Sequence, residues 1–354
     1  MKPYYLGLAL SFASISANCA TLYPAPQKPA TVLTVYSTLD TEVFRPLVDD
    51  FQALHPRISI RYEELDAMPL YARFVKEADT GKPTADLLIS TSMDLQVKLV
   101  NDGYAVPHAS ANVQAIPAWA RWRNEAFGFT FEPAVMVFNR HAMKGRNIPQ
   151  SRGELLDAIR DDPTFWRGKI GTYDISKSSV GYLLASQDVR QSSEFGALVE
   201  AFTDVDIKVE ENTATLLEQI GSGQLVAGYN LLGSYARNRI DAGSPLVLVY
   251  PKDHTLVVSR TALITKTAPN PRAAHRFLEY LLSLRGQEVL YTKSGLPPVR
   301  QEIDSVYQRL GISEAQVGLL RPIALGPGLL VYLDRQKRER LLAIWRGTLS
   351  KKRP

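Results

Sequence analysis

The chain has 354 residues, of which 45% are hydrophobic and 22% charged, and its formal net charge is +5. A chain of this length is longer than one that ordinarily folds around a single hydrophobic core, so two lobes are expected. The modest charge, with basic residues spread along the chain, argues against a nucleic-acid-binding protein, and no tract is biased enough to predict disorder.

The first residues, 1–19, are typical of a secretory signal peptide. Lys2 supplies a positive charge, and the apolar run from Leu6 to Ile15 is too short to span a bilayer. We expect cleavage after Cys19 and a soluble protein in the bacterial periplasm. A lipid anchor at Cys19 is the less favoured alternative, because Asn18 is a poor match to the small residue expected there. As the only cysteine, Cys19 would leave the mature chain without disulfides or thiolate sites.

The stretch that follows predicts a buried strand leading into a helix. Thr31 to Tyr36 is rich in Val, Leu, Thr and Tyr, and apolar residues recur at three- and four-residue spacing from Val43 to Leu54. Ser37 and Thr38 lie at the connection. Unpaired backbone N–H groups and the positive end of the helix dipole would face outward there, which favours anions and polar ligands. Helix capping is the alternative role of these hydroxyls.

The same pattern occurs at three later positions. An apolar strand over residues 85–89 ends in Ser90, Thr91 and Ser92, and Ser92 is placed to cap a helix over Asp94–Val100. In an open parallel sheet the carboxyl ends of the strands collect at one edge, where ligands bind. Two further strands are followed by polar residues that we expect at a shared crevice: Asp174, Ser178, Ser179, Asn230, Ser234 and Tyr235. Hydroxyl and N–H donors from two lobes suit a ligand that carries oxygens, such as a phosphate or carboxylate.

The order of these segments resembles the periplasmic solute-binding proteins of ABC transporters. The similar branch holds ferric-iron, phosphosugar and phosphoglycerate-regulatory binding proteins. The motifs are weak singly, and their succession from Thr31 to Arg300 carries the resemblance: GKPTADLLIST (81–91), GFTFEPAVMVFN (128–139), DISKSSVGYLL (174–184), GSGQLVAGY (221–229) and LPPVR (296–300).

The resemblance implies an α/β, two-lobe, type II-like periplasmic-binding-protein fold. Each lobe would be a mostly parallel sheet flanked by helices, and two hinge crossings would join them. Lobe 1 is expected at 31–121 and 255–354, lobe 2 at 140–250, and the hinge segments at about 122–139 and 251–260. The implied protein is a monomer without cofactor that hands a small anionic ligand to an ABC permease in the inner membrane.

Two other functions stay open on the sequence. A ferric-iron protein of this branch carries adjacent tyrosines, but here Tyr235 is followed by Ala236, so the pair is broken. A sensing role with a membrane histidine kinase would use the same fold and ligand. Enzymatic motifs such as G-x-S-x-G, H-E-x-x-H and the Walker loop are absent, so no catalytic or metal-binding residue is predicted. Five cations near predicted turns are equivalent candidates to pair with the ligand: Arg123, Arg140, Lys177, Arg237 and Arg260.

The C-terminal part predicts one more amphipathic helix. A charged run begins at Asp334 and is followed by LLAIW (341–345). Its apolar side is expected to pack on the first lobe through Leu333, Leu341, Ile344 and Trp345. Its basic side would face solvent, with contact to anionic lipid or a membrane partner as the alternative.

Overall fold

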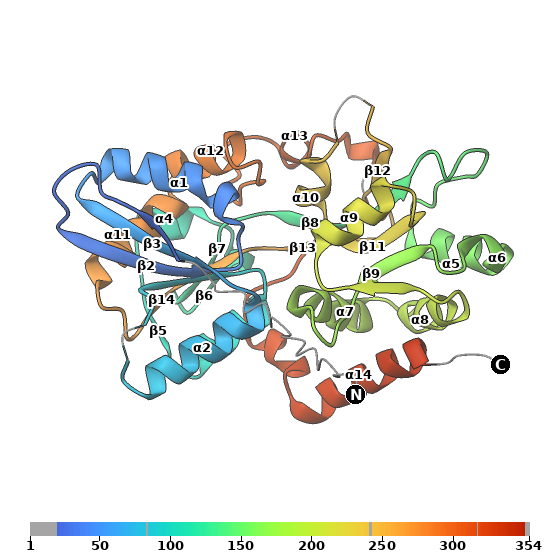
Figure 1. The fold of residues 1–354 in the computed structure, drawn as a ribbon, viewed down its shortest axis with the longest axis horizontal. Coiled ribbons are helices and arrows are strands. Elements are labelled where there is room, and N and C mark those ends of the chain that lie inside the picture. Colours follow the sequence, from blue (N-terminus) through green and yellow to red (C-terminus); the bar gives the residue numbers. More distant parts are fainter. Residues whose placement is uncertain (1–19, 83, 241–242, 317, 351–354) are drawn as a thin grey trace, which may run out of the picture.

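The computed structural model describes residues 20–82, 84–240, 243–316 and 318–350. The fold has two lobes, each with a β-sheet covered by helices (Figure 1). The signal peptide expected at 1–19 lies outside the described residues. Within the described ranges, no helix is both long enough and apolar enough to cross a membrane.

The first lobe is built on an eight-stranded sheet. In spatial order its strands are β1 (Thr21–Tyr23), β3 (Ile58–Glu64), β2 (Thr31–Ser37), β4 (Leu87–Ser90), β14 (Thr261–Thr265), β7 (Ala126–Gly128) and β6 (Arg121–Trp122), with β5 (Ala105–Val106) beside β14. Side chains alternate between the two faces, as a sheet buried on both sides requires. Val35 and Ile89 enter one hydrophobic core, whereas Tyr36 and Leu88 enter the other.

The second lobe is built on a seven-stranded sheet. Its strands, in order, are β10 (Lys208–Glu210), β9 (Ile170–Tyr173), β11 (Ala227–Leu232), β8 (Glu132–Asn139), β13 (Thr255–Val258) and β15 (Leu320–Pro322), with β12 (Leu246–Val249) paired to β8. Every residue of β8 and β11 is buried, in keeping with their central place.

The expectation of mostly parallel sheets holds only for part of each sheet. Parallel pairing joins β3, β2 and β4 in the first sheet, and β10, β9 and β11 in the second, where β13 and β15 are also parallel. The other pairs are antiparallel. Strands β8, β13 and β14 adjoin the passages between lobes, where the chain leaves one sheet and returns. Strands β8 and β14 are antiparallel to all their neighbours, and β13 is antiparallel to β8.

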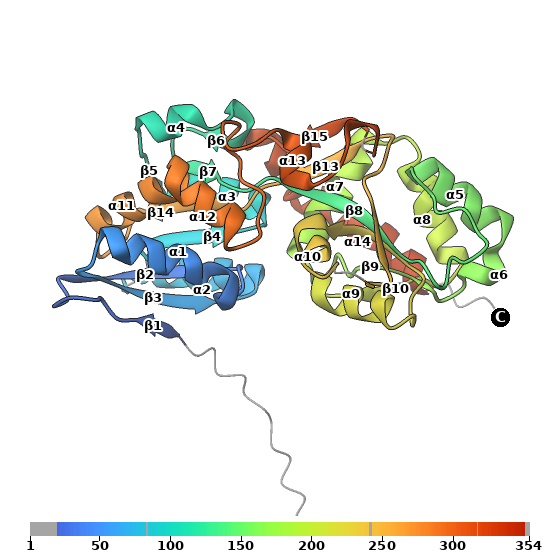
Figure 2. The ribbon, with the colours of Figure 1, turned by 90° about the horizontal axis from the view of Figure 1, so that it is seen from above.

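The chain passes between the lobes more than once (Figure 2). It leaves the first sheet after β7 for β8, and returns after β13 to β14. A further passage follows β15, where the backbone N–H of Leu325 donates to the carbonyl of Trp119 in the first lobe at 2.8 Å. The C-terminal segment is therefore in contact with the first lobe before it reaches its last helix.

Helices cover both faces of the first sheet. One face carries α1 (Thr41–Leu54), α4 (Ala111–Ala115), α11 (Pro271–Leu282) and α12 (Leu284–Thr292), and the short η1 (Ala118–Ala120) lies beside β6 and β7. The other face carries α2 (Ala67–Asp79) and α3 (Met93–Asn101). Since α1 and α3 follow β2 and β4, which are parallel, both helices begin at the same edge of the sheet.

The second sheet is covered in the same way. One face carries α5 (Arg152–Asp161), α6 (Pro163–Trp166), α7 (Ser179–Gln191) and α8 (Phe195–Asp204), and the other carries α9 (Thr213–Gly221) and α10 (Gly233–Arg237). Short elements complete the chain: α13 (Val306–Leu310), η2 (Glu314–Gln316) and η3 (Pro327–Tyr332).

The last helix, α14 (Arg335–Ser350), does not pack on the first lobe as the sequence led us to expect. Its residues Leu341, Leu342 and Trp345 belong to the core of the second lobe, next to α8, while Ile344 is 53% exposed. The segment before it, η3, packs on α3 of the first lobe. The C-terminal segment thus spans both lobes (Figure 1).

Candidate functional site

The polar turns of the first lobe bind one another. The hydroxyl of Ser37, which is fully buried, accepts the N–H of Leu39 at 3.0 Å. Thr38 Oγ1 accepts the N–H of Thr91 at 3.2 Å, and Ser90 Oγ accepts the N–H of Ser92 at 3.1 Å. These hydroxyls therefore hold two adjacent turns in shape. Neither α1 nor α3 has a side-chain capping hydrogen bond, so the helix-capping alternative is wrong for them.

Ser92 occupies the N-cap position of α3 but makes no capping hydrogen bond. Its hydroxyl is buried and has no partner among the described residues. Asp94, in the first turn of the same helix, accepts the N–H of Leu95 at 2.9 Å. A carboxylate there is favoured by the helix dipole, yet burial raises the pKa of Asp94 to about 6.

In the second lobe, one polar turn starts α7. Asp174 accepts from the N–H and hydroxyl of Ser176 at 2.9 and 2.6 Å, and Ser178 caps the helix by accepting the N–H of Gly181 at 3.4 Å. The helix lies close to β9, because a Cβ added to Gly181 would stand 2.3 Å from the Cβ of Tyr173. Glycine therefore permits this start of α7, with Ser179 as its first residue.

The turn after β11 divides its polar side chains between two places. Asn230 has φ of 59° and donates to Asp188 inside the second lobe at 2.6 Å. Ser234 donates to the buried carboxylate of Glu132, at the first passage between lobes, at 2.5 Å. Asn230 is thus part of the lobe interior, and Ser234 of the junction.

Around Glu132 lies a group that we call the crossing cluster: Asp40, Glu132, Ser234, Tyr235 and Arg260. Arg260 forms an ion pair with Glu132 at 3.0 Å and donates to the hydroxyl of Tyr235 at 3.3 Å. Tyr235 donates to Asp40, at the start of α1, at 3.0 Å, so it joins the second lobe to the first. Burial raises the pKa of Tyr235 to about 12, although the charge of Arg260 opposes the shift.

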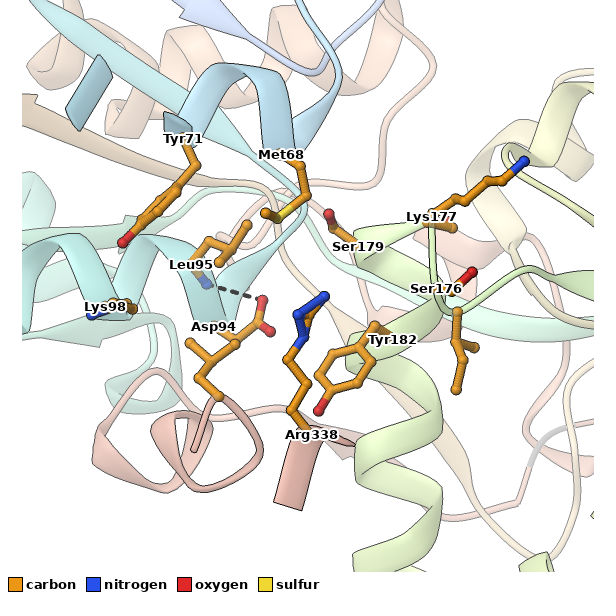
Figure 3. A pocket seen from close by; sticks show the side chains of 13 residues that line it. Met68, Tyr71, Asp94, Leu95, Lys98, Ser176, Lys177, Ser179, Tyr182 and Arg338 are labelled. Carbon is orange, nitrogen blue, oxygen red and sulfur yellow. Dashed lines mark hydrogen bonds between the residues drawn. The ribbon is translucent and has the colours of Figure 1, made fainter. Parts of the chain in front are cut away.

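Beside these turns a cavity of about 130 Å³ lies between the lobes (Figure 3). We call it the cleft cavity. Its walls come from α2 and α3 of the first lobe, the start of α7 in the second, and the C-terminal segment. They are formed by Met68, Tyr71, Asp94, Leu95, Lys98, Ile175, Ser176, Lys177, Ser178, Ser179, Tyr182, Leu333 and Arg338.

Two opposite charges face the cleft cavity. Asp94 is 4% exposed, and Arg338 points its guanidinium toward the space between Asp94 and Tyr182 (Figure 3). The guanidinium carbon lies 5.1 Å from the centre of the Tyr182 ring. Arg338 Nε is buried without a hydrogen-bond partner among the described residues. The charge of Arg338 lowers the pKa of Asp94 slightly against the larger effect of burial, but the two groups form no ion pair.

Of the ligand-binding residues predicted from sequence, only Ser178 and Ser179 line the cleft cavity. Among the five candidate cations, Lys177 also lines it, but it pairs with Glu211 at 2.9 Å in an exposed position. Sequence reasoning missed Asp94 and Arg338 as site residues. A signal for Arg338 existed: it precedes Leu341, Leu342 and Trp345 by three, four and seven residues, so a charge lies on the apolar stripe of α14.

Known proteins resemble this chain in both sequence and structure. The model of the family described as bacterial extracellular solute-binding protein matches residues 82–309. No curated protein matches the sequence significantly.

Among solved structures, a substrate-binding protein of an ABC transporter from Agrobacterium tumefaciens is similar, with 38% identity, a TM-score of 0.85, and coverage of 94% of this chain and 98% of that one. AfuA from Actinobacillus pleuropneumoniae, solved with fructose-6-phosphate bound, has 17% identity, a TM-score of 0.71 and coverage of 90% and 99%. Iron-bound HitA from Pseudomonas aeruginosa has 17% identity, a TM-score of 0.67 and coverage of 90% and 99%.

Proposed function

The chain belongs to the bacterial extracellular solute-binding protein family of ABC transporters, a family of binding proteins and not of enzymes, and we propose that its solute is a small oxyanion held between the two lobes. The class includes organic phosphates, sugar phosphates and carboxylates. The observation that carries this proposal is the guanidinium of Arg338, which enters the cleft cavity with a buried, unpartnered Nε. Guanidinium groups bind carboxylate and phosphate oxygens through paired N–H donors.

Other donors of the cavity suit the same ligand. The start of α7 brings the hydroxyls of Ser178 and Ser179 to the wall, along with the positive end of a helix dipole. The volume of about 130 Å³ is close to the ~150 Å³ known to admit a benzene-sized molecule. A small solute therefore fits, and contacts from both lobes would favour the closed arrangement once it is bound.

We place this capture in the periplasm, with delivery to an ABC permease. The apolar segment at 1–19 supports export, and the family supports the permease as partner. A role with a membrane histidine kinase would leave the ligand site unchanged. Cross-linking of the ligand-loaded protein in intact cells distinguishes the two partners, because the permease or the kinase is then recovered with it.

Ferric iron is the alternative ligand, since iron-bound HitA shares the fold. The crossing cluster argues against a ferric site at Tyr235. The phenol donates to Asp40, its pKa is raised to about 12, and the cationic Arg260 lies 3.3 Å away. A trivalent cation would meet repulsion there. We expect protein produced with iron to be colourless, and a visible charge-transfer band would favour iron.

The direct test is to identify what binds. The protein is purified gently, bound molecules are identified by mass spectrometry, and phosphates, carboxylates, neutral sugars and ferric iron are screened by thermal shift. We expect oxyanions to raise the melting temperature of the wild type but not of Arg338→Gln. Arg335→Gln serves as control, because Arg335 lies exposed on the same helix in a pair with Glu339. A shift with neutral sugars alone would contradict the proposal.

A further inference from the structure

A carboxylate as well as a guanidinium lines the cleft cavity, and this narrows the chemical class of the solute further. Asp94 comes from α3 of the first lobe and Arg338 from α14, which packs on the second. Both charges face the same small space, and no ion pair joins them (Figure 3). Resting on the proposed function, we infer that the solute carries a positively charged amine as well as its oxyanion, with the ammonium bound by Asp94 and the oxyanion by Arg338.

Within the described residues, no cation forms an ion pair with the carboxylate of Asp94. Arg338 of α14 is near but unpaired with it, and Lys98 of the same helix pairs with Asp102 at 2.5 Å. From α2, Tyr71 lines the cavity, and from α7 the hydroxyl of Tyr182 donates to the carbonyl of Tyr332 at 2.5 Å. Among the described residues, the hydrogen bonds to the Asp94 carboxylate come only from backbone N–H groups, those of Leu95 and of Asp94 itself.

A buried carboxylate without a partner is costly to the protein. Other buried acids of the described chain have partners: Asp188 lies 3.3 Å from Arg152, and Glu132 lies 3.0 Å from Arg260. Asp86 has no guanidinium in contact, but its two carboxylate oxygens accept the backbone N–H groups of Thr34 and Asn270. Asp94 differs because it opens on a cavity. A group that is destabilising in the empty protein and exposed only to a binding site is suited to a ligand that supplies the missing charge.

The charges already present in the cleft cavity indicate that the solute supplies a positive charge at Asp94. An oxyanion without an amine would bring a second negative charge into the small space beside Asp94, which disfavours ionisation of one of the two. A zwitterion places its ammonium at Asp94 and its oxyanion at Arg338, so each charge is paired. A hydroxyl-bearing anion such as a sugar phosphate could donate a hydrogen bond to Asp94, but it would leave the excess negative charge.

The experiment compares matched probes by isothermal titration calorimetry. Phosphoethanolamine and ethyl phosphate differ in the amine, as do β-alanine and propionate. We expect the amine-bearing member of at least one pair to bind the wild type tenfold or more tightly than its partner. Asp94→Asn should abolish that preference, while Arg338→Gln should weaken both members and Arg335→Gln neither. Equal affinity within both pairs, or a preference that survives Asp94→Asn, would overturn the inference.

Two further measurements test the role of Asp94: the melting temperature of the ligand-free protein and the pH dependence of ligand affinity. Ligand-free Asp94→Asn should melt higher than the wild type at pH 7.5, because it lacks the buried charge. The affinity of the wild type for phosphoethanolamine should fall more steeply below pH 6 than the affinity of Asp94→Asn, because only the wild type has a carboxylate to protonate at this position. Titration of the phosphate of the probe affects both proteins equally. Binding of fructose 6-phosphate but of neither amine probe would reject the inference and leave the proposed function standing. Binding of no oxyanion at all would reject both.

Discussion

The second lobe holds its buried charges in contact, whereas the two opposite charges of the cleft cavity form no ion pair. Inside the second lobe, Arg152 and Asp188 are buried and lie 3.3 Å from each other. Tyr229 and Asn230 also donate to Asp188, at 2.9 and 2.6 Å. In the cavity, Asp94 and Arg338 face each other without an ion pair.

The difference separates structural charges from ligand-binding ones. An ion pair in contact, with further hydrogen bonds to its carboxylate, offers few free donors or acceptors to a solute. Removing one of its members therefore damages the fold. Two charges that line a cavity without forming an ion pair have free donors and acceptors, so their loss should damage binding and can even stabilise the empty protein. Substitutions in the two regions therefore test the comparison directly.

The largest expected effect is that of Asp188→Ala in the second lobe. The substitution leaves the guanidinium of Arg152 buried without this carboxylate and removes the acceptor of Tyr229. We expect the free energy of unfolding to fall by about 3–5 kcal/mol, measured by urea denaturation. The exposed pair Arg335–Glu339 supplies the control, and Glu339→Ala should cost under ~1 kcal/mol. Similar effects of the two substitutions would show that the buried network does not stabilise the lobe.

The sequence also predicted poorly which polar side chains belong to the buried hydrogen-bonded networks. Asn230 and Ser234 follow a strand, as the pattern indicated, but Asn230 turns inward to Asp188 and Ser234 binds Glu132. Sequence identifies the turn but not the face to which a side chain points. That direction depends on φ at a single residue and on partners more than forty positions away.

The strands and helix starts of the two lobes were predictable because hydrophobic periodicity is a local property. The strand ending at Ser37, the helix after it and the start of α7 at Ser179 all follow the expected pattern. The cleft cavity was not predictable in the same way, because Asp94 and Arg338 come from distant parts of the chain. The packing of α14 on the second lobe, not the first, is what brings Arg338 to the cavity.

The next effect in size concerns the unpaired acid. Burial raises the pKa of Asp94 from 3.8 to about 6, so the protonated form is favoured in the folded state. The resulting stabilisation is present below pH 3.8 and is lost as the pH rises through 6. Asp94→Asn should therefore raise the free energy of unfolding of the ligand-free protein by about 3 kcal/mol at pH 7.5, and by little at pH 4. Urea denaturation at both pH values measures this, and a destabilised variant at pH 7.5 would place Asp94 among the structural charges.

The smallest effect tests the crossing cluster, where Tyr235 of the second lobe donates to Asp40 of the first lobe at 3.0 Å. Tyr235→Phe removes this link between lobes, and we expect about 1 kcal/mol less stabilisation of the closed arrangement, hence a roughly fivefold weaker ligand affinity. Tyr104 offers a matched control, because its hydroxyl donates to Asp79 at 2.7 Å within the first lobe. Tyr104→Phe removes the same kind of bond without touching the junction, so its affinity should equal that of the wild type. The affinities of both variants for the same ligand are measured by calorimetric titration. A loss of affinity confined to Tyr235→Phe would show that the bond between lobes stabilises the closed arrangement. Equal losses of affinity in the two variants would contradict this, because any tyrosine–aspartate bond would then have the same effect.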